Sequence, residues 1–218
     1  MTYQDVIVPI RKTNFGEADI IYSFLSAHHG RIEAIAKGIR KITSRKRGNL
    51  EIAAFSTAVF AVGKNLDIVT EAQLLEYNDQ FLNPTGGKFL FSILPTINKL
   101  ATDIEQSIKV FEVLKNVFLT YDIEQDLYFS TLIKYELLKN QDLLPDWQTC
   151  AICRVKYDML DKVDSDRKLL VCNNCARKIE ELFQFQNHLD AADFSKFSEE
   201  ELVYLKALLD RHLKSIGI

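Results

Sequence analysis

Several sequence patterns that carry catalysis or membrane insertion are missing from this chain of 218 residues. It has no G-x-x-x-x-G-K-[ST] loop, which argues against a P-loop NTPase. It also has no G-x-S-x-G and no H-E-x-x-H motif, so two common hydrolase signatures are absent. No apolar run approaches eighteen residues, so we expect no membrane span. The start, Met1-Thr-Tyr-Gln-Asp-Val, has no basic segment followed by an apolar run, so we expect no signal peptide and a cytoplasmic location.

Cysteine is scarce, and all four cysteines fall in two matched pairs. They are Cys150, Cys153, Cys172 and Cys175. The spacing C-x2-C-x18-C-x2-C is typical of a four-thiolate zinc site, because each short turn can aim two sulfurs at one ion. Such a closed site leaves no open position for substrate, so we predict one structural Zn²⁺. The alternatives are two disulfides, which need an oxidising compartment, or four unrelated thiols.

Other potential ligands and catalytic groups are less informative. No thiol remains as a nucleophile once the four cysteines are assigned to a metal. The four histidines have no zinc-pair spacing and are expected in turns or on the surface: His28, His29, His188 and His212. An acidic cluster lacks the glycine and the terminal glutamate of a calcium loop, so we expect a solvated loop: Asp158, Asp161, Asp164 and Asp166. We therefore predict that the protein is not an enzyme.

Charge is distributed unevenly along the chain. Residues 1–50 hold nine Lys or Arg against four Asp or Glu, although the whole chain has a net charge of −3. The segment 37–48 contributes six cations and no acid: Lys37, Arg40, Lys41, Arg45, Lys46 and Arg47. Cations held near phosphates release counterions and add affinity that depends on salt but not on base sequence. We interpret this segment as an exposed nucleic-acid-binding loop, and a solvated charged loop is the alternative.

Residues 5–76 contain five short β-rich runs separated by turn residues. The expected strands are 6–10, 20–25, 31–37, 55–62 and 66–72. Five strands in about seventy residues is the size of an OB barrel, which commonly binds single-stranded nucleic acid. An SH3-like barrel has a similar composition. Most aromatic residues here are expected in the core, and Phe15, beside Gly16, is the one we expect outside.

The pattern becomes helical after the segment 83–87. Apolar residues recur every three or four positions over 104–118 and 128–138, with a shorter helix expected before them that ends near Pro95. Ile179, Leu182 and Phe183 predict another short helix. Ser198 and Glu201 form a capping box that opens a last helix, stopping at Gly217.

The expected fold is α+β and divides into four parts. A five-stranded OB-like barrel takes residues 1–80 and a helical domain 81–149. A four-cysteine zinc module takes 150–178, and C-terminal helices that pack on the helical domain take 179–218.

Three segments together resemble the RecO family of bacterial recombination mediators. Asn14-Phe15-Gly16-Glu17-Ala18-Asp19, followed by Gly30 to Lys41, is similar to the family's "G-E-x-D" strand and "K-G-x-R-K" loop. Tyr135-Glu136-Leu137-Leu138 with Pro145 and the first cysteine pair resembles the entry to its zinc module, and the second cysteine pair completes it. The chain departs from the family at Arg154, where Gly is frequent after the first pair, and lacks the usual proline after the basic loop.

The resemblance implies binding of single- and double-stranded DNA and annealing of complementary strands. It also implies work with RecR, and often RecF, to load RecA on gaps coated by single-strand-binding protein, in a nucleoid-associated location. The C-terminal tail of single-strand-binding protein would dock on the helical domain. By motif match, Lys37, Arg40 and Lys41 would contact phosphates, whereas Arg45, Lys46 and Arg47 join them on charge alone.

Three other functions fit parts of the pattern. A zinc-containing OB-fold module that binds RNA or serves transcription would have the same composition. A DNA ligase also combines an OB fold with a four-cysteine site, but it needs a K-x-D-G motif that this chain lacks. A protein-interaction adaptor would make the basic loop incidental.

Overall fold

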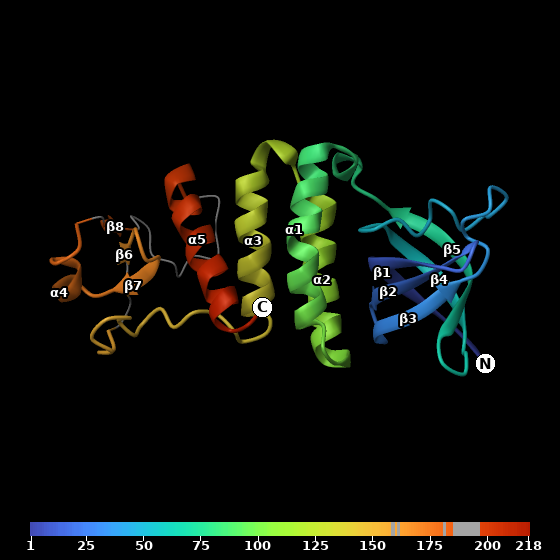
Figure 1. Ribbon diagram of the computed structural model, residues 1–218, viewed down its shortest axis with the longest axis horizontal. Helices are drawn as coiled ribbons and strands as arrows, with labels where there is room; N and C mark the ends of the chain where they lie inside the picture. Colours follow the sequence, from blue (N-terminus) through green and yellow to red (C-terminus); the bar gives the residue numbers. More distant parts are fainter. Residues whose placement is uncertain (158–159, 161, 181, 185–196) are drawn as a thin grey trace. The chain divides into compact units, whose positions relative to one another are not determined.

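The structure is a computed structural model that describes residues 1–157, 160, 162–180, 182–184 and 197–218. The chain divides into two compact units, Met1–Asp126 and Leu127–Ile218. The first holds a β-barrel and two helices, and the second holds two long helices and a small sheet (Figure 1). The expected fold class, an OB-like five-stranded barrel followed by helices and a cysteine cluster, is confirmed.

Five strands close the barrel in the order β1-β2-β3-β5-β4. Their bounds are β1 Thr2–Phe15, β2 Asp19–Ser26, β3 Gly30–Ala36, β4 Phe55–Ala61 and β5 Asp67–Glu76. All pairs are antiparallel except β3 with β5, which pair in parallel at Ala34↔Asp67 and Ile35↔Ile68. This parallel pair closes the barrel, so it forces residues 37–54 to cross from β3 to β4 as a long connection. That connection carries the basic segment.

Alternating side chains fill the barrel, as a period of two requires. β3 shows this most clearly, because Ile32, Ala34 and Ala36 are buried and Glu33 between them is exposed. Phe24 and Phe60 meet edge to face at 5.8 Å between ring centroids inside this core. Fully buried rings of this size each remove about 150–250 Å² from water and dominate the stability of so small a barrel.

Helices α1 (Pro84–Leu100) and α2 (Ile104–Thr120) complete the first unit, together with the 3-10 turns η1 (Asp79–Leu82) and η2 (Ile123–Gln125). Asn83 caps α1 through Thr85 N–H, and Asp103 caps α2 through Gln106 N–H. α2 lies against β2 and β3. The approach is closest at Gly30, where a Cβ atom would stand 2.7 Å from the Cα of Ile104.

The expectation that the first helix ends near Pro95 is wrong, because α1 continues to Leu100. Pro95 lies on the exposed side of the helix, where its missing N–H leaves the Phe91 carbonyl without its helical partner. The opposite face stays buried before and after the proline, at Leu90, Ile93 and Ile97. Packing of this face outweighs the cost of about 3 kcal/mol that an interior proline carries.

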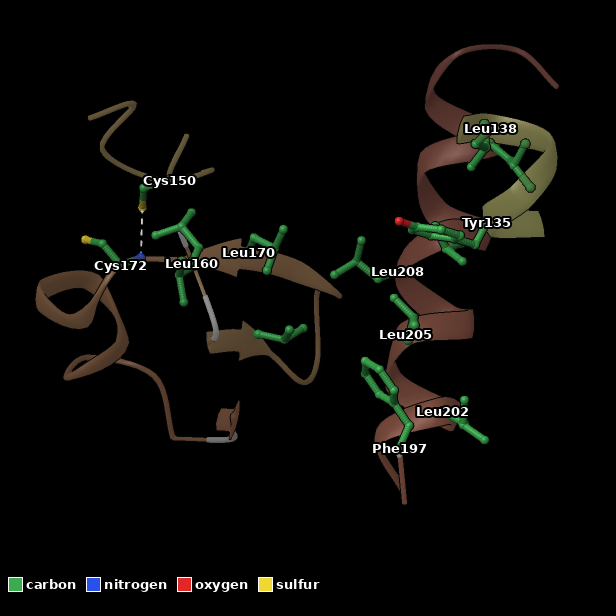
Figure 2. Packing of buried hydrophobic residues seen from close by; sticks show 14 of the residues in the cluster. Tyr135, Leu138, Cys150, Leu160, Leu170, Cys172, Phe197, Leu202, Leu205 and Leu208 are labelled. Carbon is green, nitrogen blue, oxygen red and sulfur yellow. Dashed lines mark hydrogen bonds between the residues drawn. The ribbon is translucent and has the colours of Figure 1, made fainter. Parts of the chain in front are cut away.

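The second unit packs a small sheet and two helices around one apolar cluster (Figure 2). Its elements are α3 Asp126–Lys139, β6 Lys162–Asp164, β7 Leu169–Val171, α4 Asn173–Ala176, β8 Leu182–Gln184 and α5 Glu199–Ser215. In Figure 2, Leu208 points from α5 towards β7, which carries Leu170. The predicted capping box of Ser198 and Glu201 is present at the start of α5, and Gly217, at φ +81°, follows its end.

Two expectations in the second unit are corrected. The short helix predicted at 179–183 is wrong, because Leu182–Gln184 form strand β8, paired with β6. Apolar residues spaced by three cannot distinguish one turn of helix from so short a strand. Asp164 is not a solvated loop residue: it is 3% exposed and its Oδ1 accepts hydrogen bonds from the N–H groups of Asp166 and Arg167. Asp158, Asp161 and His188 lie outside the described residues.

Candidate nucleic-acid surface and metal centre

The start of the basic loop is fastened to the turn between β1 and β2. Gly38 N–H donates to Asp19 Oδ1 at 2.7 Å, and Arg40 N–H donates to the Ala18 carbonyl at 2.9 Å. The guanidinium of Arg40 also reaches the carbonyl of Gly16 at 3.4 Å. Gly38 adopts φ +66°, which glycine reaches without strain. Ile39 is 3% exposed and anchors the loop in the barrel core.

The far end of the loop is fastened to β5. Lys46 Nζ donates to the Val69 carbonyl at 2.8 Å, and Asn49 Nδ2 donates to the Ala72 carbonyl at 2.9 Å. Burial lowers the pKa of the Lys46 ammonium below its usual value. The loop therefore crosses from β3 to β4 with both ends tied to the barrel (Figure 1).

The six predicted phosphate contacts differ in accessibility. Five are exposed: Lys37, Arg40, Lys41, Arg45 and Arg47. Lys46 is half-buried, and its ammonium already has a backbone partner. The first five side chains are therefore accessible from solvent, whereas Lys46 mainly holds the loop.

Two grooves flank the basic loop on the barrel surface. One, of about 660 Å³, has Arg45 and Lys46 on its wall above polar residues of β4 and β5 such as Thr57 and Thr70. The other, of about 460 Å³, is lined by Arg40 and Arg47 with residues of β1 and β2. Cations on the walls of grooves this open suit an extended polyanion better than a small enclosed ligand.

Among the aromatic residues of the barrel strands, all of which the structure describes, Phe15 is the one whose ring is clearly exposed and could stack on a base. Phe15 is 54% exposed at the end of β1, as expected from its place beside Gly16. Tyr22, Phe24, Phe55 and Phe60 are buried. Because Arg40 bonds to the carbonyl of the next residue, Gly16, Phe15 lies beside the turn that borders the basic loop.

A carboxylate with two histidines on the barrel was not found from the sequence. Asp5 has a fully buried side chain, and its two oxygens lie 2.7 Å from the Nδ1 atoms of His28 and His29. Backbone N–H groups of both histidines also donate to Oδ2. Burial of the Asp5 carboxyl opposes its ionisation, but these hydrogen bonds outweigh burial and lower its pKa. The cluster ties β1 to the turn between β2 and β3. The one sign of it in the sequence is an acid, Asp5, directly before the apolar run of that strand.

The four cysteines meet, as their spacing predicts. Each offers one sulfur, and the four Sγ atoms lie within 4.8 Å of one another. Cys150 and Cys153 stand on a turn that is closed by Arg154 N–H bonding to the Cys150 carbonyl at 3.0 Å. Cys172 directly precedes α4 and Cys175 lies within it, and Ala176 N–H bonds to the Cys172 carbonyl at 2.9 Å. Four converging sulfurs are a set that could hold a metal ion.

The surroundings of Cys172 favour its thiolate, whereas burial and then the neighbouring sulfurs raise the pKa of Cys175. A hydrogen bond from Tyr157 is the main cause that lowers the pKa of Cys172 to about 6. Cys172 N–H also donates to the Cys150 sulfur at 3.4 Å, drawn as the dashed line in Figure 2. Thiolates, not thiols, are the metal-binding form of cysteine.

Comparison with known proteins finds similarity to one family of DNA repair proteins. The sequence model of the family described as "Recombination protein O N terminal" matches residues 1–78, which hold all five barrel strands. A DNA repair protein RecO of Dehalococcoides mccartyi strain BAV1 is 28% identical over 172 residues, which are 76% of this chain and 67% of that protein. The chain is similar to RecO proteins, and its barrel matches the model of their N-terminal domain.

Two further RecO proteins show how the similarity is distributed. DNA repair protein RecO of D. mccartyi strain 195 is 31% identical over 152 residues, covering 67% of this chain and 59% of that protein. RecO of a Nocardioides species is 40% identical, but over 75 residues that cover 34% of this chain and 31% of the relative. Identity to RecO is thus higher in the shorter match. In the part of the chain that the structure describes, no helix is long and apolar enough to span a membrane.

Proposed function

We propose that this chain is a recombination mediator that binds single- and double-stranded DNA and anneals complementary strands. The observation that carries the proposal is the basic loop of the barrel, which presents five exposed cations and is tied to the barrel at both ends. Exposed cations on a fixed loop contact phosphates without regard to base sequence. A mediator that acts at DNA gaps of any sequence needs contacts of this kind.

Annealing needs no catalytic group. Two DNA strands repel each other, and a basic surface that neutralises phosphates on both lowers that repulsion without breaking a covalent bond. Base pairing then supplies the driving force and the sequence selectivity. The two grooves beside the loop offer routes for the strands on either side of the cations.

The proposed partners are inferred from the similarity of this chain to RecO proteins. They are RecR, in many members RecF, and the C-terminal tail of single-strand-binding protein, which this chain would engage while RecA is loaded. We propose Zn²⁺ for the cysteine cluster, where it would join two turns and stabilise the second unit. Four thiolates leave no open coordination position, so the ion would take no part in DNA chemistry.

Fluorescence anisotropy of a labelled single-stranded oligonucleotide, titrated across a salt series, tests the DNA contact. Five phosphate contacts predict a slope of log affinity against log salt of about −3.5, at about −0.7 per contact. The variant Arg45→Ala/Arg47→Ala is expected to make the slope less steep by about 1.4. Lys64→Ala, an exposed cation in the β4–β5 turn, is the matched control and should leave the slope unchanged.

Two outcomes would contradict the proposal. Absence of binding at low salt would favour an adaptor whose basic loop is incidental. A marked preference for an RNA oligonucleotide of the same sequence would favour the RNA-binding alternative, since annealing of DNA requires no such preference.

A further inference from the structure

The second unit contains a cavity of about 360 Å³ between the metal-binding segment and α5. Three cationic residues line it, Arg154 after the first cysteine pair, Lys168 before β7 and Arg211 of α5. Aliphatic side chains, among them Leu169 and Leu208, form much of the rest of the lining. The cavity is separate from the basic loop and from the four sulfurs, and it combines a cationic edge with an apolar floor.

Two of the three cations stand on strained backbone. Arg154 has φ +62° and Lys168 has φ +53°, in the left-handed region that glycine occupies most easily. Each closes a turn, Arg154 through the Cys150 carbonyl and Lys168 through the Asp164 carbonyl. Glycine would close both turns without strain, so the turns alone do not explain two long cations lining one cavity.

The charges around the cavity do not cancel. The acid in the lining is Asp146, which accepts hydrogen bonds from Thr149 and from the N–H of Gln148. These bonds lower the pKa of Asp146, so it is charged at neutral pH and offsets one cation of the three. Arg211 uses one donor on the Arg167 carbonyl, and Lys168 lies 4.5 Å from the centre of the Tyr204 ring, so both are held in position.

We propose that this cavity binds one nucleotide unit of a single DNA strand. The phosphate meets Arg154, Lys168 and Arg211, and the sugar and base pack on the leucine floor. Three cations, two of them held in position, match a phosphodiester better than the single carboxylate at the end of a peptide, and the volume is that of a small-molecule site. The inference rests on the proposed DNA binding and extends it, because it gives the chain a second strand contact outside the barrel.

The test is the same anisotropy titration of the full chain, with the variant Arg154→Gly/Lys168→Gly. Glycine removes both charges and relieves the positive φ angles, so the thermal midpoint should not fall. The salt slope is expected to become less steep by up to about 0.7, because the slope counts the phosphates neutralised and the cavity holds one. Arg177→Gln, an exposed cation of the same segment outside the cavity lining, is the control and should retain the unaltered slope.

The outcomes separate this inference from the proposed function. If Arg45→Ala/Arg47→Ala weakens binding but the glycine variant binds with unaltered affinity and slope, the cavity is not a strand site and the barrel proposal stands. If the unaltered chain binds no oligonucleotide, both fail. If the glycine variant loses affinity only for an acidic, apolar-tipped peptide tested in parallel, the occupant is a peptide and the inference is overturned.

Discussion

The Sγ atoms of Cys153 and Cys172 lie 3.8 Å apart, one from each cysteine pair. A tetrahedron with metal–sulfur bonds of about 2.3 Å has edges of about 3.8 Å, so this separation is that of two ligands of one ion. It is far longer than the disulfide S–S bond of about 2.05 Å. The geometry thus agrees with four thiolates around one metal ion, and not with disulfides.

Removal of the metal is expected to destabilise the second unit. The ion would join the turn at 150–153 to Cys172 and α4, two segments that are separated by eighteen residues of the chain. Hydrogen exchange after chelation should show faster exchange across Leu127–Ile218, with the barrel strands as an internal control. Metal analysis should find about one zinc per chain, and Cys172→Ser should abolish it. Unchanged exchange in the metal-free protein would contradict this role.

Asp5→Asn should lower the free energy of unfolding by about 2–3 kcal/mol, because the donors of His28 and His29 lose a charged acceptor whose side chain is fully buried. The pKa of Asp5 is lowered in the folded protein, so its stabilisation is full above the ordinary value of 3.8 and is lost as pH falls through the lowered one. Urea unfolding from pH 7 down to pH 2 checks this. The two proteins should converge in acid, and exposed Glu17→Gln should change little at any pH.

Gly30→Ala tests the contact of the barrel with α2. An added Cβ would stand 2.7 Å from the Ile104 Cα at a φ of +70°, so strain and overlap both act. We expect a loss of about 3 kcal/mol or more in unfolding free energy. Gly16→Ala is the matched control, since Gly16 has φ +58° and open space around it, and it should cost about 1–2 kcal/mol. Equal losses would show that the contact with α2 contributes nothing.

Lys46 and Arg45 are neighbours in the basic loop that should respond differently to alanine. Lys46→Ala removes the donor to the Val69 carbonyl and should lower the unfolding free energy by about 1 kcal/mol. Arg45→Ala should leave stability within about 0.5 kcal/mol while weakening oligonucleotide binding, because its side chain is exposed. Thermal unfolding and anisotropy on both variants check the division; a larger stability loss for Arg45→Ala would contradict it.

Sequence patterns predicted the parts that depend on local chemistry. Alternation in 31–37 predicted strand β3, and cysteine spacing predicted the ligand set, because both follow from residues close in the chain. Pro95 led to the wrong end for α1, since burial of the opposite face is a tertiary effect. The pairing of Asp5 with His28 and His29 could not be predicted for the same reason: it forms only when β1 and β2 pair.

Anchoring both ends of the loop between β3 and β4 has a consequence for binding rates. A free twelve-residue basic segment would lose much of its conformational entropy on meeting a strand. Here Asp19 at one end and the β5 carbonyls at the other restrict the loop before any ligand arrives. Pre-organisation of this kind mainly slows dissociation. Mutation of Asp19, which touches no phosphate, should therefore shorten the lifetime of a DNA complex while leaving the salt slope intact.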